Sequence, residues 1–402
     1  MKPYYENNLS KIYHGNSLDI LKQLPERSVN CCVTSPPYWG LRDYGTGTWV
    51  GGDPECHHIK KHQKHGGARA DRDRTSQVFS YNDICGVCGA QKKDDQLGLE
   101  ETPEQYVENM VELFSEVKRI LRDDGTLWLN LGDSYYGGGW KGSQTDLTGT
   151  KQGTNTGTLA GKDMKKDPPH PIIKTKDLRG IPWRVAFALQ ADGWYLRQDI
   201  IWHKPNPMPE SVTDRCTKAH EYIFLLSKSK KYYFNQDSIL EDCSPNTHAR
   251  LSQDIQNQIG SDRVPGKTNG KMKAVGRKYD PGRGNKNNPS FDAAMAIMPG
   301  KRNKRSVWTA NTKPYSEAHF AVYPEELIEP CIKAGCPKGG TVFDPFNGSG
   351  TTLLVAAKQK KHGIGVDLSE DYIKIASNRL EQYRTGLTKD ELNSGKQILF
   401  GE

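Results

Sequence analysis

Apolar and polar positions follow two kinds of pattern along the chain, one typical of buried strands and one typical of helices. Val29–Ser35 is a run of apolar and β-branched residues without alternation, which predicts a buried strand. From Pro103 apolar residues recur at helical spacing until Asp124 and Gly125, so a helix is predicted there, followed by a strand at Thr126–Gly132. Similar patterns predict short strands or helices at residues 11–15, 17–24, 182–191, 195–203, 221–226, 324–335, 341–346, 350–360, 362–368 and 370–383. Strands that alternate with helices favour an α/β fold, a doubly wound and mostly parallel sheet covered on both faces.

Composition indicates a soluble protein with long polar loops. The chain has 402 residues, of which 35% are hydrophobic and 26% are charged. No apolar run approaches the length of a membrane span, and the N-terminal segment lacks the apolar core of a signal peptide, so a cytoplasmic location is expected. Nine cysteines without a secretion signal indicate thiols or metal ligands, and argue against a disulfide framework.

The net charge of +8 is distributed unevenly. Lys228–Arg305 is rich in Lys, Arg, Asn and Gly and poor in acids, which suits a polyanion as the partner. The same composition is also typical of a solvated loop that has no partner.

A glycine-rich turn in Thr341–Thr352, with the sequence TVFDPFNGSGTT, indicates a ligand site at the end of a strand. Gly348 and Gly350 let the backbone approach a ligand, and the turn lacks the lysine of a phosphate-binding loop. Asp344 at the end of the strand can hold an ammonium group. Asp367, at the end of the next strand, can accept hydrogen bonds from both hydroxyls of a ribose. S-adenosylmethionine is a ligand that has both an amino-acid part and a ribose.

The sequence TSPPYW ends the first buried strand, and therefore lies at the same edge of the predicted sheet. Pro36 and Pro37 fix the backbone so that main-chain carbonyls point to a set place. A carbonyl and the Ser35 hydroxyl can both accept hydrogen bonds from an exocyclic amino group, and Tyr38 offers a face on which a base can stack. These acceptors favour a tetrahedral nitrogen with an available lone pair, which can attack a methyl sulfonium directly. A base within a duplex must be flipped out to reach such a pocket.

TSPPYW, followed much later by DPFNGSGTT and GVDLS, resembles the amino-methylating DNA methyltransferases, the N4-cytosine/N6-adenine family. The motif order resembles that of the permuted β class, and the resemblance covers residues 11–44, 100–235 and 305–383. It implies the fold of S-adenosylmethionine-dependent methyltransferases with loop-rich inserts, and it implies that the target amino group is held by Ser35, Pro36, Pro37 and Tyr38.

The resemblance also implies which residues bind the cofactor. HGNSLDIL resembles the segment that touches the adenine of the cofactor, although Asn16 stands where family members often have Asp. Ser306–Leu327 resembles the segment before the cofactor strand, in which His319 and Phe320 would close over the methionine end. The predicted cofactor-binding set is Asn16, Asp344, Phe346, Gly348, Gly350, Thr351 and Asp367.

The implied activity is site-specific methylation of double-stranded DNA, which allows for a partner restriction endonuclease. Serine at position 35 is more usual in the cytosine-N4 subgroup, so cytosine N4 is the preferred target and adenine N6 the alternative. A protein methyltransferase and an inactive zinc-containing nucleic-acid-binding module are two further hypotheses. The order of the two motifs, with the Pro-Pro loop before the cofactor turn, and the basic segment argue against a protein methyltransferase. The intact acids and glycines of the cofactor turn argue against an inactive module.

An insert follows the predicted catalytic loop, Ser35–Tyr38. It contains the sequences CHH (Cys56–His58) and CGVC (Cys85–Cys88). Cys-x-x-Cys is a half-site for zinc, and Cys-x-His completes a tetrahedral site of three cysteines and one histidine. The predicted ligands are Cys56, His58, Cys85 and Cys88, although the sequence barely separates His58 from His57. With all four positions filled, the zinc would be structural. The alternative is a flexible loop with thiols.

These patterns divide the chain into segments with different expected roles. Asn, Lys and Arg in the basic segment can contact phosphates and base edges, so it is predicted to recognise the DNA target. The expected boundaries are 1–44 and 97–235 for the catalytic half of the methyltransferase domain, 45–96 for the insert, 236–305 for target recognition, 306–384 for the cofactor-binding half and 385–402 for a tail.

Overall fold

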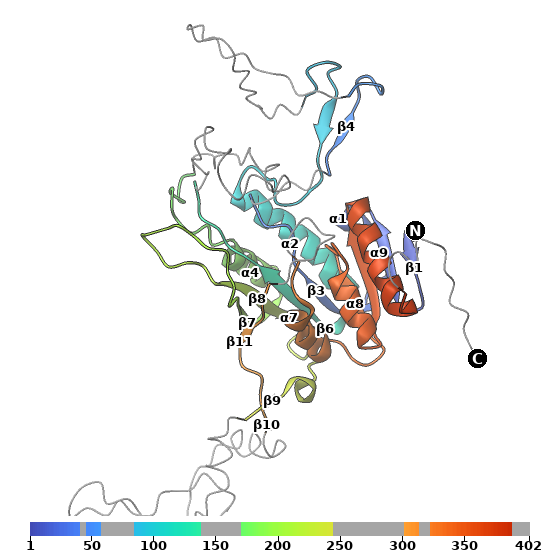
Figure 1. Cartoon of the computed structure of the whole chain (residues 1–402), viewed down its shortest axis with the longest axis vertical. Coiled ribbons are helices and arrows are strands. Elements are labelled where there is room, and N and C mark those ends of the chain that lie inside the picture. Colours follow the sequence, from blue (N-terminus) through green and yellow to red (C-terminus); the bar gives the residue numbers. More distant parts are fainter. Residues whose placement is uncertain (41–45, 58–83, 138–169, 244–300, 313–321, 388–402) are drawn as a thin grey trace, which may run out of the picture. The chain divides into compact units, whose positions relative to one another are not determined.

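A computed structural model describes six stretches of the chain: residues 1–40, 46–57, 84–137, 170–243, 301–312 and 322–387 (Figure 1). Most of the basic segment therefore lies outside the described residues, as do His58, His319 and Phe320. The chain divides into two compact units, one made of residues 1–234 and 306–402 and the other of residues 235–305.

A mixed sheet forms the centre of the first unit, and in the described ranges it has nine strands in the order β1-β2-β13-β12-β3-β6-β8-β7-β11. Strand β8 runs antiparallel to β6 and β7, β1 runs antiparallel to β2, and the other neighbours are parallel. The strands are β1 (Tyr5–Glu6), β2 (Ser10–His14), β3 (Val29–Thr34), β6 (Leu121–Leu131), β7 (Tyr195–His203), β8 (His220–Ser227), β11 (Val307–Thr309), β12 (Thr341–Asp344) and β13 (His362–Asp367). The predicted α/β class with a mostly parallel sheet is confirmed.

Helices cover both faces of this sheet. One layer is formed by α1 (Ser17–Gln23), α2 (Pro103–Ile120) and α4 (Ile181–Ala191), and the other by α7 (Glu325–Gly335), α8 (Thr351–Lys358) and α9 (Glu370–Thr385). Successive residues of β2 show the two layers, because strand side chains alternate between faces: Ile12 packs in the cluster of α8 and α9, and Tyr13 in that of α1 and α2. In Figure 1 the red helix α9 lies beside the blue N-terminal strands, consistent with the pairing of β13 and β2.

The boundary between α2 and β6 differs from the prediction. The helix ends at Ile120, and the strand begins at Leu121. Val29 of β3 pairs with Leu121 and Cys31 pairs with Thr126, so the exposed residues between them bulge out of the ladder. The predicted helix was too long because the apolar Leu121 continues the helical spacing in the sequence. In the structure Leu121 is buried as the first residue of β6.

Two short pairs of strands lie outside the large sheet. Strands β4 (Thr48–Val50) and β5 (Gln91–Lys93) form an antiparallel hairpin within the predicted insert. In the second unit, β9 (Glu241–Asp242) pairs with β10 (Lys301–Arg302), and a 3-10 turn spans Gln236–Ile239. Within the described stretches, no helix combines the length and apolar character that a membrane crossing requires.

Candidate active site

A cavity of about 500 Å³ lies where β2, β3, β12 and β13 end, lined by residues that follow each of these strands. The predicted catalytic loop and the predicted cofactor turn share it, as the sequence-based hypothesis requires. The predicted site residues that line it are Asn16, Ser35, Pro36, Pro37, Tyr38, Phe346, Gly348, Thr351 and Asp367. Asp344 and Gly350 are not among its lining residues.

The two glycines of the turn between β12 and α8 have different structural roles. Gly348 has a φ of +50° and faces open space, since an added Cβ would meet no atom closer than 3.9 Å. Gly350 has a φ of +79°, and its added Cβ would lie 2.8 Å from the Cβ of Ala376 in α9. Gly348 therefore leaves the turn open, while Gly350 allows α8 and α9 to pack closely.

Asp367 lies at the end of β13 and lines the cavity. Its Oδ1 accepts a hydrogen bond of 2.8 Å from the Ser369 N–H, and its Oδ2 accepts one of 2.7 Å from the Gly348 N–H. Burial raises the pKa of this carboxyl to about 6. Each carboxylate oxygen can accept a second hydrogen bond, so the group has capacity left for a ligand with two neighbouring hydroxyls.

Asp344 is buried behind the cavity, and its carboxylate is fully engaged with the protein. Oδ1 accepts hydrogen bonds from Thr34 Oγ1 (2.7 Å) and from the Phe346 N–H (3.0 Å). Oδ2 accepts from Thr352 Oγ1 (2.6 Å) and from the Tyr323 hydroxyl (3.1 Å). Burial raises the pKa of Asp344. The predicted direct contact with an ammonium group thus lacks a free acceptor, and the carboxylate instead joins β3, β12 and α8.

The predicted catalytic loop, Ser35–Tyr38, is held by hydrogen bonds on both sides of its two prolines. The Ser35 hydroxyl donates to the Tyr38 hydroxyl at 3.3 Å, which in turn donates to Glu221 Oε2 at 2.8 Å. The Pro37 carbonyl accepts a hydrogen bond of 2.8 Å from the Tyr106 hydroxyl of α2. The order of donors leaves the oxygen of Ser35 as an acceptor for another group.

Sequence reasoning did not identify three cavity residues that support this loop: Asn130, Lys204 and Glu221. Lys204 forms an ion pair with Glu221 Oε1, and Asn130 Nδ2 lies 3.3 Å from Glu221 Oε2. Glu221 comes just before the apolar run of β8. An acidic residue near the start of a buried strand was the available signal for a site residue. Only the sheet order, which places β8 next to β6, brings it to Tyr38.

The predicted metal ligands are brought together in part. The sulfur atoms of Cys56, Cys85 and Cys88 all lie within 4.8 Å of one another. His57 is not a member of this cluster, and the predicted His58 lies outside the described residues.

Comparison with known proteins identifies similar chains. The model of a family described as DNA methylase matches residues 29–378. The Type II methyltransferase M.Cfr9I of Citrobacter freundii is 36% identical over 384 residues, which are 96% of this chain and 92% of that protein. The Type II methyltransferase M.SmaI of Serratia marcescens is 37% identical over 384 residues, 94% of either chain.

A solved structure titled PvuII DNA methyltransferase (cytosine-N4-specific) has a similar fold. It matches with a TM-score of 0.53 and 15% sequence identity, over 98% of this chain and 93% of that one. The predicted fold class, a doubly wound sheet of the methyltransferase type, is confirmed by this likeness.

Proposed function

The chain belongs to the family of DNA methylases and is a DNA methyltransferase, and from this premise we propose that it methylates the exocyclic N4 of cytosine with S-adenosylmethionine. The observation that carries the proposal is the single cavity shared by the Ser35–Tyr38 loop and the turn around Gly348. Methylation of adenine N6 is the alternative. The related proteins named above are Type II methyltransferases, and we propose a partner restriction endonuclease for this chain.

The residues of the cavity fit S-adenosylmethionine. The open space at Gly348 leaves room for the methionine part, and the spare acceptor capacity of Asp367 suits the two ribose hydroxyls. Phe346 and Asn16 complete the proposed contacts. When bound, the cofactor supplies a methyl group on a positively charged sulfur.

We assign Asp344 an indirect role in cofactor binding. Tyr323 lines the cavity, and its hydroxyl donates to Asp344 and contacts Thr352 Oγ1, so the carboxylate and the threonine together hold the tyrosine beside the proposed cofactor site. The Phe346 N–H also donates to Asp344, so the same carboxylate fixes the turn that lies next to the ligand. Asp344 is thus proposed as a positioning residue.

The catalytic loop is proposed to bind the flipped-out base by its amino group. Glu221, paired with Lys204, accepts the hydrogen of the Tyr38 hydroxyl, so Tyr38 in turn accepts the hydrogen of Ser35. This order of donors turns the lone pairs of Ser35 towards the amino group. The carbonyl of Pro36 is the proposed second acceptor, because that of Pro37 is already bonded to Tyr106. Catalysis then consists of positioning and electrostatics, with direct attack by the nitrogen.

The target base is tested by methylating DNA with the purified protein, digesting it to nucleosides and measuring their masses. We expect N4-methylcytosine. N6-methyladenine would establish the alternative, and methyl transfer to protein but not to DNA would contradict both. DNA binding without any transfer would support the hypothesis of an inactive binding module.

Recognition of the DNA target is proposed to lie in residues 236–305, on the basis of their Lys, Arg and Asn content. Residues 244–300 lie outside the described part, so this proposal rests on composition and on the separation of residues 235–305 as a unit.

Cofactor binding is expected to weaken as the pH falls through about 6, the raised pKa of Asp367. The ionised carboxylate accepts from ribose hydroxyls, and protonation removes one of its acceptor sites. Asp367→Asn should weaken binding by about 10- to 100-fold near neutral pH and flatten the pH dependence. Calorimetric titration with S-adenosylmethionine between about pH 5 and pH 7.5 measures both effects.

Two other titratable groups affect Asp367 and require a control. His14 lowers the pKa of Asp367, and Asp344 raises it. His14→Gln should preserve the weakening at low pH, because the titrating carboxylate remains. Loss of the pH dependence in this variant would assign it to the imidazole.

A further inference from the structure

Three cysteines from two separate segments of the insert converge at one point. Cys56 follows β4, and Cys85 and Cys88 precede β5. The sulfur atoms of Cys56 and Cys85 are 3.8 Å apart. A disulfide would place them about 2.05 Å apart. Two thiolates on one tetrahedral zinc, with bonds of about 2.3 Å, have a separation of about 3.8 Å. The observed spacing therefore excludes a disulfide and fits two thiolates that share a metal ion.

The backbone around the cluster is shaped to accommodate thiolates. The Val87 N–H lies 3.5 Å from Cys85 Sγ and donates to it, and the Gly89 N–H donates to the Cys85 carbonyl at 3.0 Å. Gly89 has a φ of +74°, which lets the chain turn sharply after Cys88. Hydrogen bonds from backbone N–H groups to a ligating sulfur orient it and stabilise its negative charge.

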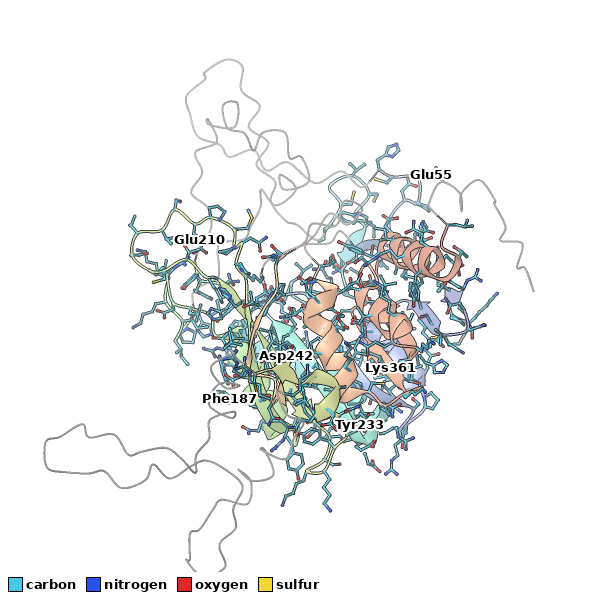
Figure 2. All side chains as sticks on the ribbon, turned by 60° about the horizontal axis from the view of Figure 1, so that its bottom comes forward. Glu55, Phe187, Glu210, Tyr233, Asp242 and Lys361 are labelled. Atoms are coloured by element: carbon cyan, nitrogen blue, oxygen red, sulfur yellow. The ribbon has the colours of Figure 1, made fainter. Side chains whose placement is uncertain are left out.

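The segment after β4, which contains Cys56, also leaves room for the sulfur atoms. An added Cβ at Gly52, which has a φ of +73°, would lie 2.8 Å from Cys88 Sγ. A glycine at this position therefore leaves room for the sulfur. Cys56 is placed by a turn in which its N–H donates to the Asp53 carbonyl at 3.1 Å. Glu55, labelled in Figure 2, belongs to the same turn.

We propose that Cys56, Cys85 and Cys88 bind one Zn²⁺ and that this ion fixes the insert beside the catalytic loop. Soft thiolate ligands in a tetrahedral arrangement favour zinc over harder divalent cations. His58 remains the fourth ligand predicted from the sequence. The ion has a structural role, and its binding does not depend on the proposed reaction.

The two ends of the insert are held together beside the Ser35–Tyr38 loop. The Gly40 N–H donates to the Gly98 carbonyl at 2.9 Å, and the Thr46 hydroxyl donates to Asp94 Oδ1 at 3.0 Å. An added Cβ at Gly98 would lie 3.0 Å from the carbonyl oxygen of Tyr38. Thr46 also lines the cavity. Loss of the ion should therefore loosen the part of the cavity next to Ser35–Tyr38, which is the proposed base pocket, and leave the turn at Gly348 unchanged.

The test measures zinc in the purified full-length protein, without cofactor or DNA. We expect one Zn²⁺ per chain, and we expect it to be lost in Cys85→Ser and in Cys56→Ser. Cys216→Ser is the matched control and should retain the ion, because Cys216 is exposed and outside the cluster. A chain without zinc, or a Cys85→Ser variant that keeps it fully, overturns the proposal.

Thiol reactivity provides a second measurement that does not depend on the folding of a variant. Treatment of the wild-type protein with a chelator should make three further thiols reactive, and added Zn²⁺ should protect them again. Unchanged reactivity contradicts the proposal. In Cys85→Ser, methyl transfer should fall while affinity for S-adenosylmethionine stays unchanged, whereas equal loss of both would contradict the assigned position beside the base pocket.

The fourth ligand is tested by the pair His57→Ala and His58→Ala. Loss of zinc only in His58→Ala supports the site of three cysteines and His58. Retention of zinc by both variants supports the thiolate site and overturns the histidine as its fourth ligand.

Discussion

Replacement of Ser35 by alanine is expected to lower kcat by about 10²- to 10³-fold, the usual effect of removing one preorganised polar group from the reacting atoms. The affinity for S-adenosylmethionine should not change, because Ser35 belongs to the loop after β3 and the proposed cofactor contacts lie after β2, β12 and β13. Single-turnover methyl transfer and calorimetric titration measure the two quantities. Ser28→Ala, at the other end of β3, is the matched control. A Ser35→Ala variant with wild-type kcat would exclude the proposed contact with the amino group.

The supporting hydrogen bonds allow a sharper version of this test. Tyr38→Phe removes the hydroxyl that contacts Ser35, and Glu221→Gln removes the negative charge that orients this hydroxyl; each should lower kcat by about 5- to 30-fold. If Glu221 acts through Ser35, Glu221→Gln should have little further effect when Ser35 is already alanine. Additive losses in the double variant would indicate that Glu221 has a separate, structural role.

Asp344→Ala is expected to destabilise the protein by about 3–5 kcal/mol, because it leaves a set of buried donors without their acceptor. Three hydroxyls and one backbone N–H, from Thr34, Thr352, Tyr323 and Phe346, donate to this carboxylate. The loss should appear as a lower urea midpoint with an unchanged m-value.

Two variants separate this structural role from a direct contact with the cofactor. Asp371→Ala removes an exposed carboxylate in the first turn of α9, and should cost less than about 1 kcal/mol. Asp344→Asn keeps one acceptor oxygen and should show an intermediate stability. If Asp344→Asn has wild-type stability but does not bind S-adenosylmethionine, the direct ammonium contact predicted from the sequence is right and the indirect role is wrong.

The sequence was sufficient for the elements and turns whose patterns are local. The alternation of strands with helices, the Pro-Pro loop and the glycine-rich turn all depend on neighbouring residues, and the structure places both motifs at one cavity. Gly348 and Gly350 look equivalent in the sequence. The close packing of Ala376 against Gly350 shows that Gly350 allows α8 and α9 to approach each other, and this contact is visible only in the structure.

Features that depend on tertiary contacts could not be predicted in this way. Glu221 lies in β8 and Lys204 directly follows β7, both far in sequence from the Ser35–Tyr38 loop, and single charges at strand ends carry no periodic signal. Asp344 was expected to face the ligand because it ends a strand. In the structure its carboxylate accepts hydrogen bonds from four donors, and three of these come from residues outside its own turn, which only the tertiary fold brings close.

The pairing of β2 with β13 has a consequence for how the protein is made. β2 is among the first strands to leave the ribosome, but β13, its parallel neighbour in the sheet, is synthesised almost last. Such distant pairings make folding slow, because a long stretch of chain must be closed before they form. A nascent chain that stops before residue 341 lacks both β12 and β13, and β2 and β3 remain as open edges. The sheet is therefore completed only near the end of translation, and chaperones that shield exposed strand edges should bind the incomplete chain until then.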